Sequence, residues 1–212
     1  WGRLKMQASV LGYFVHEKVE RFEARPDKAV ATPAFFGSFK VLKNHDLSVR
    51  AFYKRMFRMP TFNDLYYTDM GNAFLKPEYA EQFNVGLKYT RNFEKSPFMR
   101  MLDVSVDAYY NKITDKIIAY PKGQQFRWTM LNLGEVEIKG VDAVLNTQFS
   151  LGKLEVTTKF QYTYQEAIDV TDPADTYYRD QIPYIPWHSG SAILALFYKG
   201  WGLNYSFIYT GQ

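Results

Sequence analysis

The most regular feature of this chain is a strict alternation of apolar and polar residues over 153–165. One face carries Leu154, Val156, Thr158, Phe160, Tyr162 and Tyr164, which are apolar or aromatic apart from Thr158. The same alternation recurs over 201–210. A period of two predicts a β-strand, because successive side chains of a strand point to opposite faces. Both runs are as long as the roughly 9–11 residues with which a tilted strand crosses a bilayer, so we predict membrane-spanning strands.

Nine segments show strand character, and their connections alternate in length. The expected strands are 2–14, 33–42, 47–58, 79–91, 99–118, 128–149, 153–166, 187–198 and 201–211. The short connections are 43–46, 92–98, 150–153 and 198–201, and the long ones are 16–32, 59–78, 121–127 and 168–186. Outer-membrane barrels have tight turns at one end and extended loops at the other. The pattern therefore predicts an all-β, transmembrane, antiparallel up-and-down β-barrel. Bacterial barrels normally have an even number of strands, so we expect this chain to be part of a larger barrel.

Two expected strands carry irregular patterns. Within 128–149, Val136 and Ile138 fall on one register and Val141 on the other, so we expect a bulge at Gly140. Strand 187–198 is apolar on both faces, and the pattern does not orient it. Polar positions such as Asp103 and Asp107 predict a water-accessible or plugged interior rather than an acid–base pair.

Composition removes several function classes. Aromatic residues make up 18% of the chain, which suits strands and aromatic girdles. Mean hydropathy is −0.33, which argues against helical membrane spans. The net charge is only +4 and no basic stripe is visible, so we expect no nucleic-acid partner. The chain has no cysteine, which excludes disulfides and thiolate metal sites.

Three stretches, at 57–78, 132–142 and 182–188, resemble the barrel domain of TonB-dependent outer-membrane receptors, in the order found in that family. The residues at the motif positions are Arg58, Pro60, Asn63, Leu65, Pro77, Glu78, Gly134, Gly140, Asp142, Pro183 and Pro186. The chain departs from the family pattern at Asp64 and Asp142, where the family usually has Glu, and at the inserted pair Ala73-Phe74.

The resemblance implies a barrel of about 22 strands with a plugged lumen, in the bacterial outer membrane. Residues 1–212 would form part of that single barrel domain, in its C-terminal half, without the plug domain or the final strands. The implied function is active import of a metal chelate, a cobalamin or an iron siderophore, and the segment 58–67 favours cobalamin. The implied partners are membrane lipid, the chelate, and the TonB energy-coupling complex through the absent N-terminal region. A surface lipoprotein can join them. No catalytic residue and no resident cofactor are expected.

Aromatic and arginine side chains in the long connections are the best candidates for ligand contact. They are Tyr66, Tyr67, Tyr120, Arg127, Trp128, Tyr177, Tyr178 and Arg179. Rigid rings supply contact area at low entropic cost, and arginine adds charge-assisted hydrogen bonds. Trp128 and some of the tyrosines could instead belong to the outer aromatic girdle.

Metal binding and two rival functions stay open at this stage. The acidic loop 166–175 could gather calcium, although its spacing is not that of an EF-hand. His16, His45 and His188 lack metal-ligand spacing, and haem uptake would most require His16. One rival function is a passive porin-like channel. The other is a soluble β-sandwich, either a glycan-binding module or a glycan-acting enzyme, in which the apolar faces would pack against each other.

Overall fold

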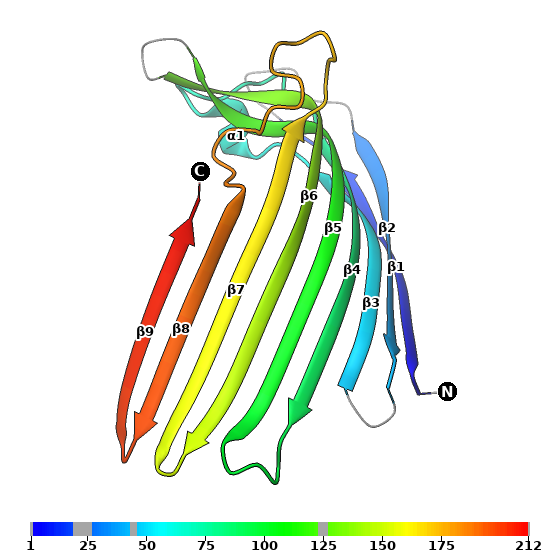
Figure 1. The fold of residues 1–212 in the computed structure, drawn as a ribbon. Helices are drawn as coiled ribbons and strands as arrows, with labels where there is room; N and C mark the ends of the chain where they lie inside the picture. The colour runs from blue at the N-terminus through cyan, green and yellow to red at the C-terminus, as the bar shows by residue number, and fades with distance from the viewer. Residues whose placement is uncertain (1, 19–26, 43–45, 123–126, 212) are drawn as a thin grey trace.

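The computed structural model describes residues 2–18, 27–42, 46–122 and 127–211. Nine strands form one antiparallel sheet in which each strand pairs with its neighbours in the chain (Figure 1). The strands are β1 (Leu4–Val15), β2 (Lys28–Lys40), β3 (Asp46–Arg58), β4 (Glu78–Asn92), β5 (Met99–Lys122), β6 (Arg127–Leu151), β7 (Leu154–Asp169), β8 (His188–Tyr198) and β9 (Trp201–Thr210). One short helix, α1 (Phe62–Tyr66), lies between β3 and β4.

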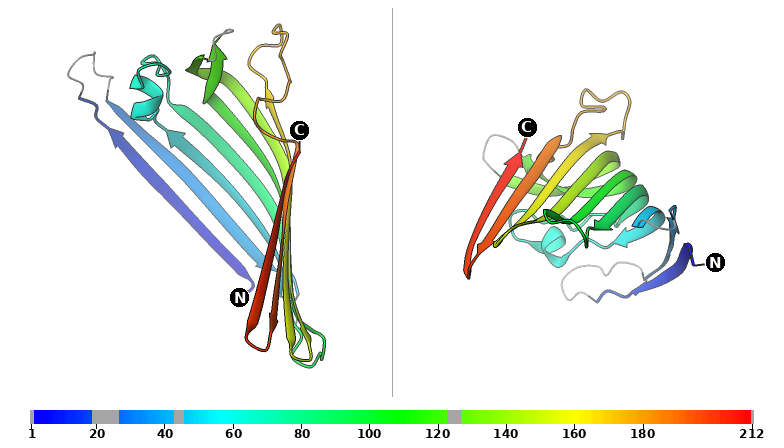
Figure 2. Two further views of the ribbon diagram at one scale, coloured as in Figure 1. Left: turned by 90° about the vertical axis from the view of Figure 1, so that its left-hand side faces the viewer. Right: turned by 60° about the horizontal axis from the view of Figure 1, so that its bottom comes forward.

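The two ends of the sheet differ as predicted. Short turns join the strands at the bottom of Figure 1, whereas α1 and the segment 170–187 lie at the top. We call these the inner and the outer end. Figure 2 shows the sheet curving into an open trough with β1 and β9 at its two edges. Among the described residues, no helix is long and apolar enough to cross a membrane.

The strand β5 extends further outward than expected, to Lys122 rather than residue 118, whereas β6 begins within one residue of the expected start. They are 24 and 25 residues long and stay paired up to Lys122 and Arg127. Tyr120, expected outside the strands, therefore belongs with Trp128 to a long hairpin at the outer end of the sheet (Figure 1).

Cross-strand register sorts the side chains into an apolar face and a polar face. One row of the apolar face runs Phe149, Val156, Leu196 and Leu203 from β6 to β9. This register orients β8, which the sequence pattern alone does not: Leu196 lies on the apolar face, and Phe197 on the polar face. All nine described strands belong to one sheet, whereas a β-sandwich requires two sheets packed face to face.

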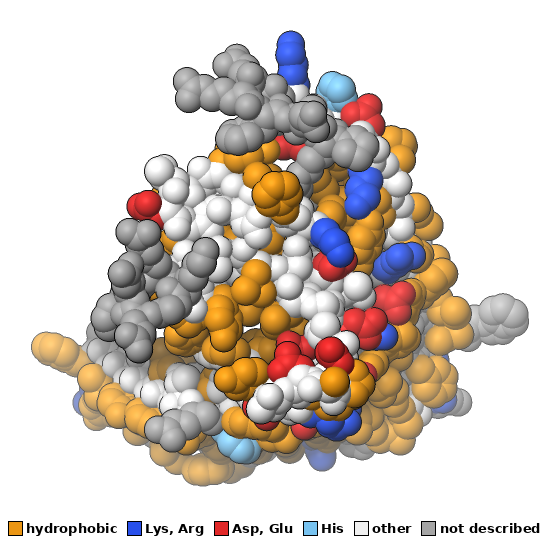
Figure 3. All heavy atoms as spheres, turned by 90° about the horizontal axis from the view of Figure 1, so that it is seen from above, with side chains coloured by type: hydrophobic (Ala, Val, Ile, Leu, Met, Phe, Trp, Pro, Cys, Tyr) orange, Lys and Arg blue, Asp and Glu red, His pale blue; other side chains and the backbone are white. Residues whose placement is uncertain are grey.

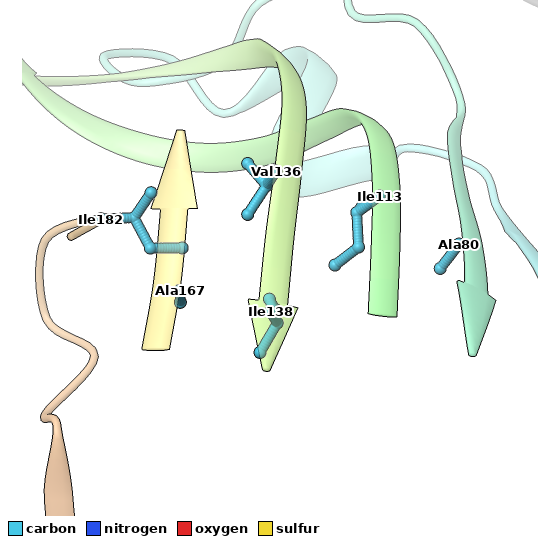
Figure 4. Close-up of a cluster of buried hydrophobic side chains, with 6 residues drawn as sticks. All are labelled: Ala80, Ile113, Val136, Ile138, Ala167 and Ile182. Atoms are coloured by element: carbon cyan, nitrogen blue, oxygen red, sulfur yellow. The ribbon is translucent and has the colours of Figure 1, made fainter. Parts of the chain in front are cut away.

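The bulge expected at Gly140 is wrong. The register of β5 and β6 is continuous past Gly140, and its one shift lies between Met99 and Met101. Val136 and Ile138 are on the polar-face register, and they are apolar because the segment 170–187 covers them. Figure 4 shows this buried cluster, in which Ile182 lies beside Val136 and Ala167. The apolar residues change from one face of β6 to the other because the segment 170–187 covers the polar face at its outer end. No bulge is needed to explain the change.

Candidate functional site

The outer end of the sheet carries the candidate site, and its foundation is the turn that holds α1. Thr61 caps the helix: its hydroxyl accepts from the Asp64 backbone N–H at 3.2 Å, and the Asp64 carboxylate accepts from the Thr61 N–H at 2.8 Å. Such reciprocal capping satisfies two backbone donors that a helix start leaves unpaired. Asp64 therefore performs the capping role with one methylene fewer than the family's usual Glu.

Arg58 ties this turn to the sheet. Its guanidinium lies 3.5 Å from a Glu78 carboxylate oxygen and 4.0 Å from Asp64. The same Glu78 oxygen accepts from the backbone N–H of Ile117 on β5 at 3.1 Å. Leu65 of α1 is buried against Leu75 and Ile117. The motif residues at 58–78 thus join β3, α1, β4 and β5 into one platform.

Asn132 fastens the approach to β4 onto the long hairpin. Its side-chain oxygen accepts from the Lys76 N–H at 2.8 Å. Its side-chain nitrogen donates to the Lys76 carbonyl at 3.1 Å and to the Asp115 carbonyl at 2.7 Å. One amide therefore replaces a pair of backbone ladder bonds between segments that are 56 residues apart in the chain.

The segment 170–187 is held to the top of β6 and β7. The Thr171 hydroxyl accepts a hydrogen bond from the Glu135 N–H at 3.0 Å. The residue before Glu135 is Gly134, and any Cβ there would lie 2.3 Å from the Thr171 methyl group. Gln181 accepts from the Ala167 N–H at 2.8 Å, and Ile182 donates to the Ala167 carbonyl at 2.8 Å. These contacts place Ile182 in the buried cluster. Among the family-motif residues, Arg58, Leu65, Glu78 and Gly134 therefore anchor the outer loops.

A hollow of about 400 Å³ lies between the long hairpin and this segment. Tyr120, Leu131 and Leu133 line it from the hairpin, and Tyr177 and Asp180 from the segment. Asp169 and Asp175 also line it. Seen from above, the outer surface shows acidic side chains gathered beside hydrophobic ones (Figure 3). The site is thus an aromatic and aliphatic hollow bordered by carboxylates.

Of the eight predicted ligand contacts, the structure brings Tyr120 and Tyr177 together in this hollow. Tyr67 is 59% exposed, whereas Tyr66 packs partly against the Leu65 cluster and lies 3.4 Å from Glu17 through its hydroxyl. Trp128 contacts the ring of Tyr184 at 5.7 Å between centroids. This Tyr184 was missed, although its place in an aromatic-rich outer loop could have indicated it.

The other predicted contacts lie nearby or outside the described side chains. Tyr178 and Arg179 belong to the tight return of the segment 170–187, and Arg179 is exposed with a φ of 68°. Arg127 begins β6, and its side chain lies outside the described part of the structure, as does His45.

The carboxylates and histidines with metal-binding potential have local hydrogen-bond partners. Asp172 and Asp175 accept from backbone N–H groups two residues further on, at 2.8 and 3.0 Å. His16 lies 2.7 Å from Asp27, and His188 lies 2.8 Å from the Tyr162 hydroxyl. Within the described ranges, no three His, Cys, Asp or Glu side chains gather as metal ligands.

The polar face below the site carries paired charges. Arg50 binds Asp107 across β4, Lys88 lies 3.3 Å from Asp103, and Asp142 accepts from the Thr163 hydroxyl at 2.7 Å. Asp142, another motif residue, therefore lies on the polar face beside Asp107. Position 140, two residues before Asp142, requires glycine because the Tyr109 ring covers it. Any Cβ there would lie 2.3 Å from the ring.

Comparison with known proteins assigns the chain to a protein family. A family model described as "TonB dependent receptor-like, beta-barrel" matches residues 13–212. The chain belongs to this family. Its barrels lie in the outer membrane of Gram-negative bacteria, so the predicted fold and location are confirmed.

Two curated relatives are named Vitamin B12 transporter BtuB. The one from Vibrio vulnificus is 32% identical over 99 residues, which is 47% of this chain and 14% of that protein. The one from Photobacterium profundum is 34% identical over 113 residues, which is 50% of this chain and 16% of that protein. Among solved structures, the copper transporter OprC matches with a TM-score of 0.65 and 17% identity, covering 99% of this chain and 32% of that one. The OprC likeness concerns the fold alone.

Proposed function

We propose that this chain is the barrel wall and outer vestibule of a receptor that imports cobalamin. The observation that carries the proposal is the hollow at the outer end, which is lined by Tyr120 and Tyr177 together with three aspartates. The two relatives named as vitamin B12 transporters support the same ligand.

The chemistry of the hollow favours cobalamin over an anionic iron siderophore. Tyrosine and leucine side chains offer apolar area to a large flat ligand such as a corrin ring. The carboxylates of Asp169, Asp175 and Asp180 can accept hydrogen bonds from the amide groups at the corrin rim. The same three negative charges would repel an anionic ferric chelate.

The remaining parts of the transporter are proposed on the family resemblance. We propose that all of 1–212 belongs to one barrel domain, whose polar face surrounds a plug. Energy coupling through the TonB complex would then depend on residues outside this chain. The carboxylate and basic groups of the polar face, such as Arg50 and Asp107, suit an interior occupied by protein and water.

Uptake by whole cells tests the function. Cells carrying the full-length gene should accumulate radiolabelled cobalamin, and a strain lacking it should not. Within the full-length protein, the double variant Tyr120→Ala with Tyr177→Ala should lower cobalamin affinity. The matched double variant Tyr205→Ala with Tyr209→Ala, on β9 and away from the hollow, should not. Equal uptake with and without the gene would contradict the proposal, and so would uptake of a labelled siderophore in place of cobalamin.

A passive channel predicts a different result. A barrel without a plug would conduct ions steadily in planar bilayers and would import cobalamin without the energy-coupling complex. Uptake that continues in cells lacking that complex would therefore support the channel and contradict active import.

A further inference from the structure

The apolar face carries a continuous row of aromatic rings across four strands. Phe35, Tyr53, Phe83 and Tyr110 are register partners on β2, β3, β4 and β5. Neighbouring ring centroids lie 6.4, 4.9 and 6.4 Å apart. The Lys139 ammonium on β6 ends the row, 5.8 Å from the Tyr110 ring centroid. We call this set the aromatic row.

Charges begin directly outward of the aromatic row. Two residues further along each strand, Arg55, Glu81, Lys112 and Glu137 are register partners on β3 to β6. Two residues of a strand span about 7 Å. The apolar face therefore changes from aromatic to fully charged within one side-chain row, as expected where hydrocarbon meets the head-group region.

Small side chains lie directly inward of the aromatic row. Gly37, Ala51, Val85 and Ala108 are register partners on the same four strands. In the next row inward each of the four strands carries a larger residue than in this one: Phe39, Val49, Leu87 and Val106. On each strand this row therefore holds the smallest of three successive residues on the apolar face, and these four residues and the aromatic row line a hollow of about 660 Å³, which we call the groove.

We propose that this groove is a binding site for the acyl chain of a single membrane lipid. The groove interrupts the lipid-facing surface of an outer-membrane barrel, so hydrocarbon is what reaches it. Its side chains on this face are aliphatic or aromatic, with polar atoms only at the Tyr53 and Tyr110 hydroxyls on the outward side. A methylene chain fills such a groove without leaving a polar group unpaired, whereas water would find few partners there.

The aromatic row forms the outward wall of the groove. It closes the groove on the side of the charged row, so a chain that enters from the inward side ends against these rings. The Tyr110 hydroxyl donates to the Glu137 carboxylate at 2.9 Å, which holds the ring upright at the β5 end. The occupant is thus held against a fixed wall, in contrast to a lipid that slides over a smooth barrel surface.

Filling the groove tests the site in full-length protein purified from outer membranes into mild detergent. Gly37→Leu is a suitable change because a Cβ there would meet only the Ala51 carbonyl oxygen, at 4.0 Å. Ala51→Leu fills the same space from the next strand. Ala192→Leu, on the apolar face of β8, makes a matched substitution outside the groove.

Native mass spectrometry after exhaustive detergent exchange reports the occupant. We expect one lipid to remain on the wild type and on Ala192→Leu, and to be lost from Gly37→Leu and Ala51→Leu. Heat-modifiable migration on gels checks that each barrel is folded. A wild type that retains no lipid, groove-filled variants that retain it, or a mass showing a second copy in its place would each overturn the proposal. None of these outcomes depends on which substrate the receptor imports.

Discussion

Arg50 on β3 and Asp107 on β5 form a bidentate ion pair across the intervening strand β4. The guanidinium Nε lies 3.0 Å from one carboxylate oxygen, and a second guanidinium nitrogen binds the other. The pair passes directly over Gly86, which has no side chain to obstruct it. The polar face thus links strands that do not share backbone hydrogen bonds.

Gly86→Ala should therefore break this link. A Cβ at Gly86 would lie 2.1 Å from the Asp107 carboxylate and 3.1 Å from the Arg50 guanidinium. Losing charge-assisted hydrogen bonds of this kind costs about 1.5–3 kcal/mol of unfolding free energy. Urea unfolding in vesicles measures it, and Gly37→Ala is the matched control because its Cβ has no close neighbour. Equal stability of the two variants would show that the ion pair does not stabilise the barrel.

Arg58→Ala should loosen the outer platform without unfolding the sheet. Arg58 joins the α1 turn to Glu78, and Glu78 also accepts from β5. Limited proteolysis of the barrel in vesicles should cut the segment 61–77 several times faster in this variant. Arg91→Ala, at the inner end of β4, should leave the rate unchanged. A wild-type cleavage rate in Arg58→Ala would mean that α1 is held by its buried leucines alone.

Asn132→Asp tests the amide that joins the long hairpin to the segment before β4. The carboxylate keeps an acceptor for the Lys76 N–H but faces the Lys76 and Asp115 carbonyls without a donor. Hydrogen exchange at residues 76 and 115–117 should speed up, while exchange in β7 to β9 stays slow. Asn204→Asp on the exposed strand β9 is the control. Unchanged exchange at Lys76 would contradict the role given to Asn132.

The strands could be predicted from sequence because a barrel strand faces two uniform solvents. Hydrocarbon on one side and a polar interior on the other impose the period of two seen from Leu154 to Tyr164. Tight inner turns and long outer loops add the parity that identifies the barrel. The environment of each position then follows from its neighbours in the chain alone.

The sequence-based prediction of β6 failed where a segment distant in the chain, rather than solvent, covers the strand. Val136 and Ile138 are apolar on the polar-face register because Ile182 covers them, and no local pattern contains that information. The orientation of β8 was ambiguous because both of its faces are apolar, and only its pairing with β7 resolves it.

The candidate site was predicted in its residue types but only partly in its geometry. Tyr120 and Tyr177 line one hollow because the long hairpin and the segment 170–187, which are far apart in the sequence, both border it. The motif residues proved more structural than a functional motif suggests: Arg58, Glu78 and Gly134 hold loops in place.

Placing a charge on each face of one strand tests the central claim, that hydrocarbon surrounds the apolar face. Phe160 and Gln161 are adjacent on β7 and point to opposite faces. Phe160→Arg should destabilise the full-length barrel in lipid vesicles by about 2–4 kcal/mol, the penalty for arginine near the bilayer midplane, whereas Gln161→Arg should have little effect. Equal tolerance of both arginines would contradict the account, because it would mean that water or protein, and not lipid, covers Phe160.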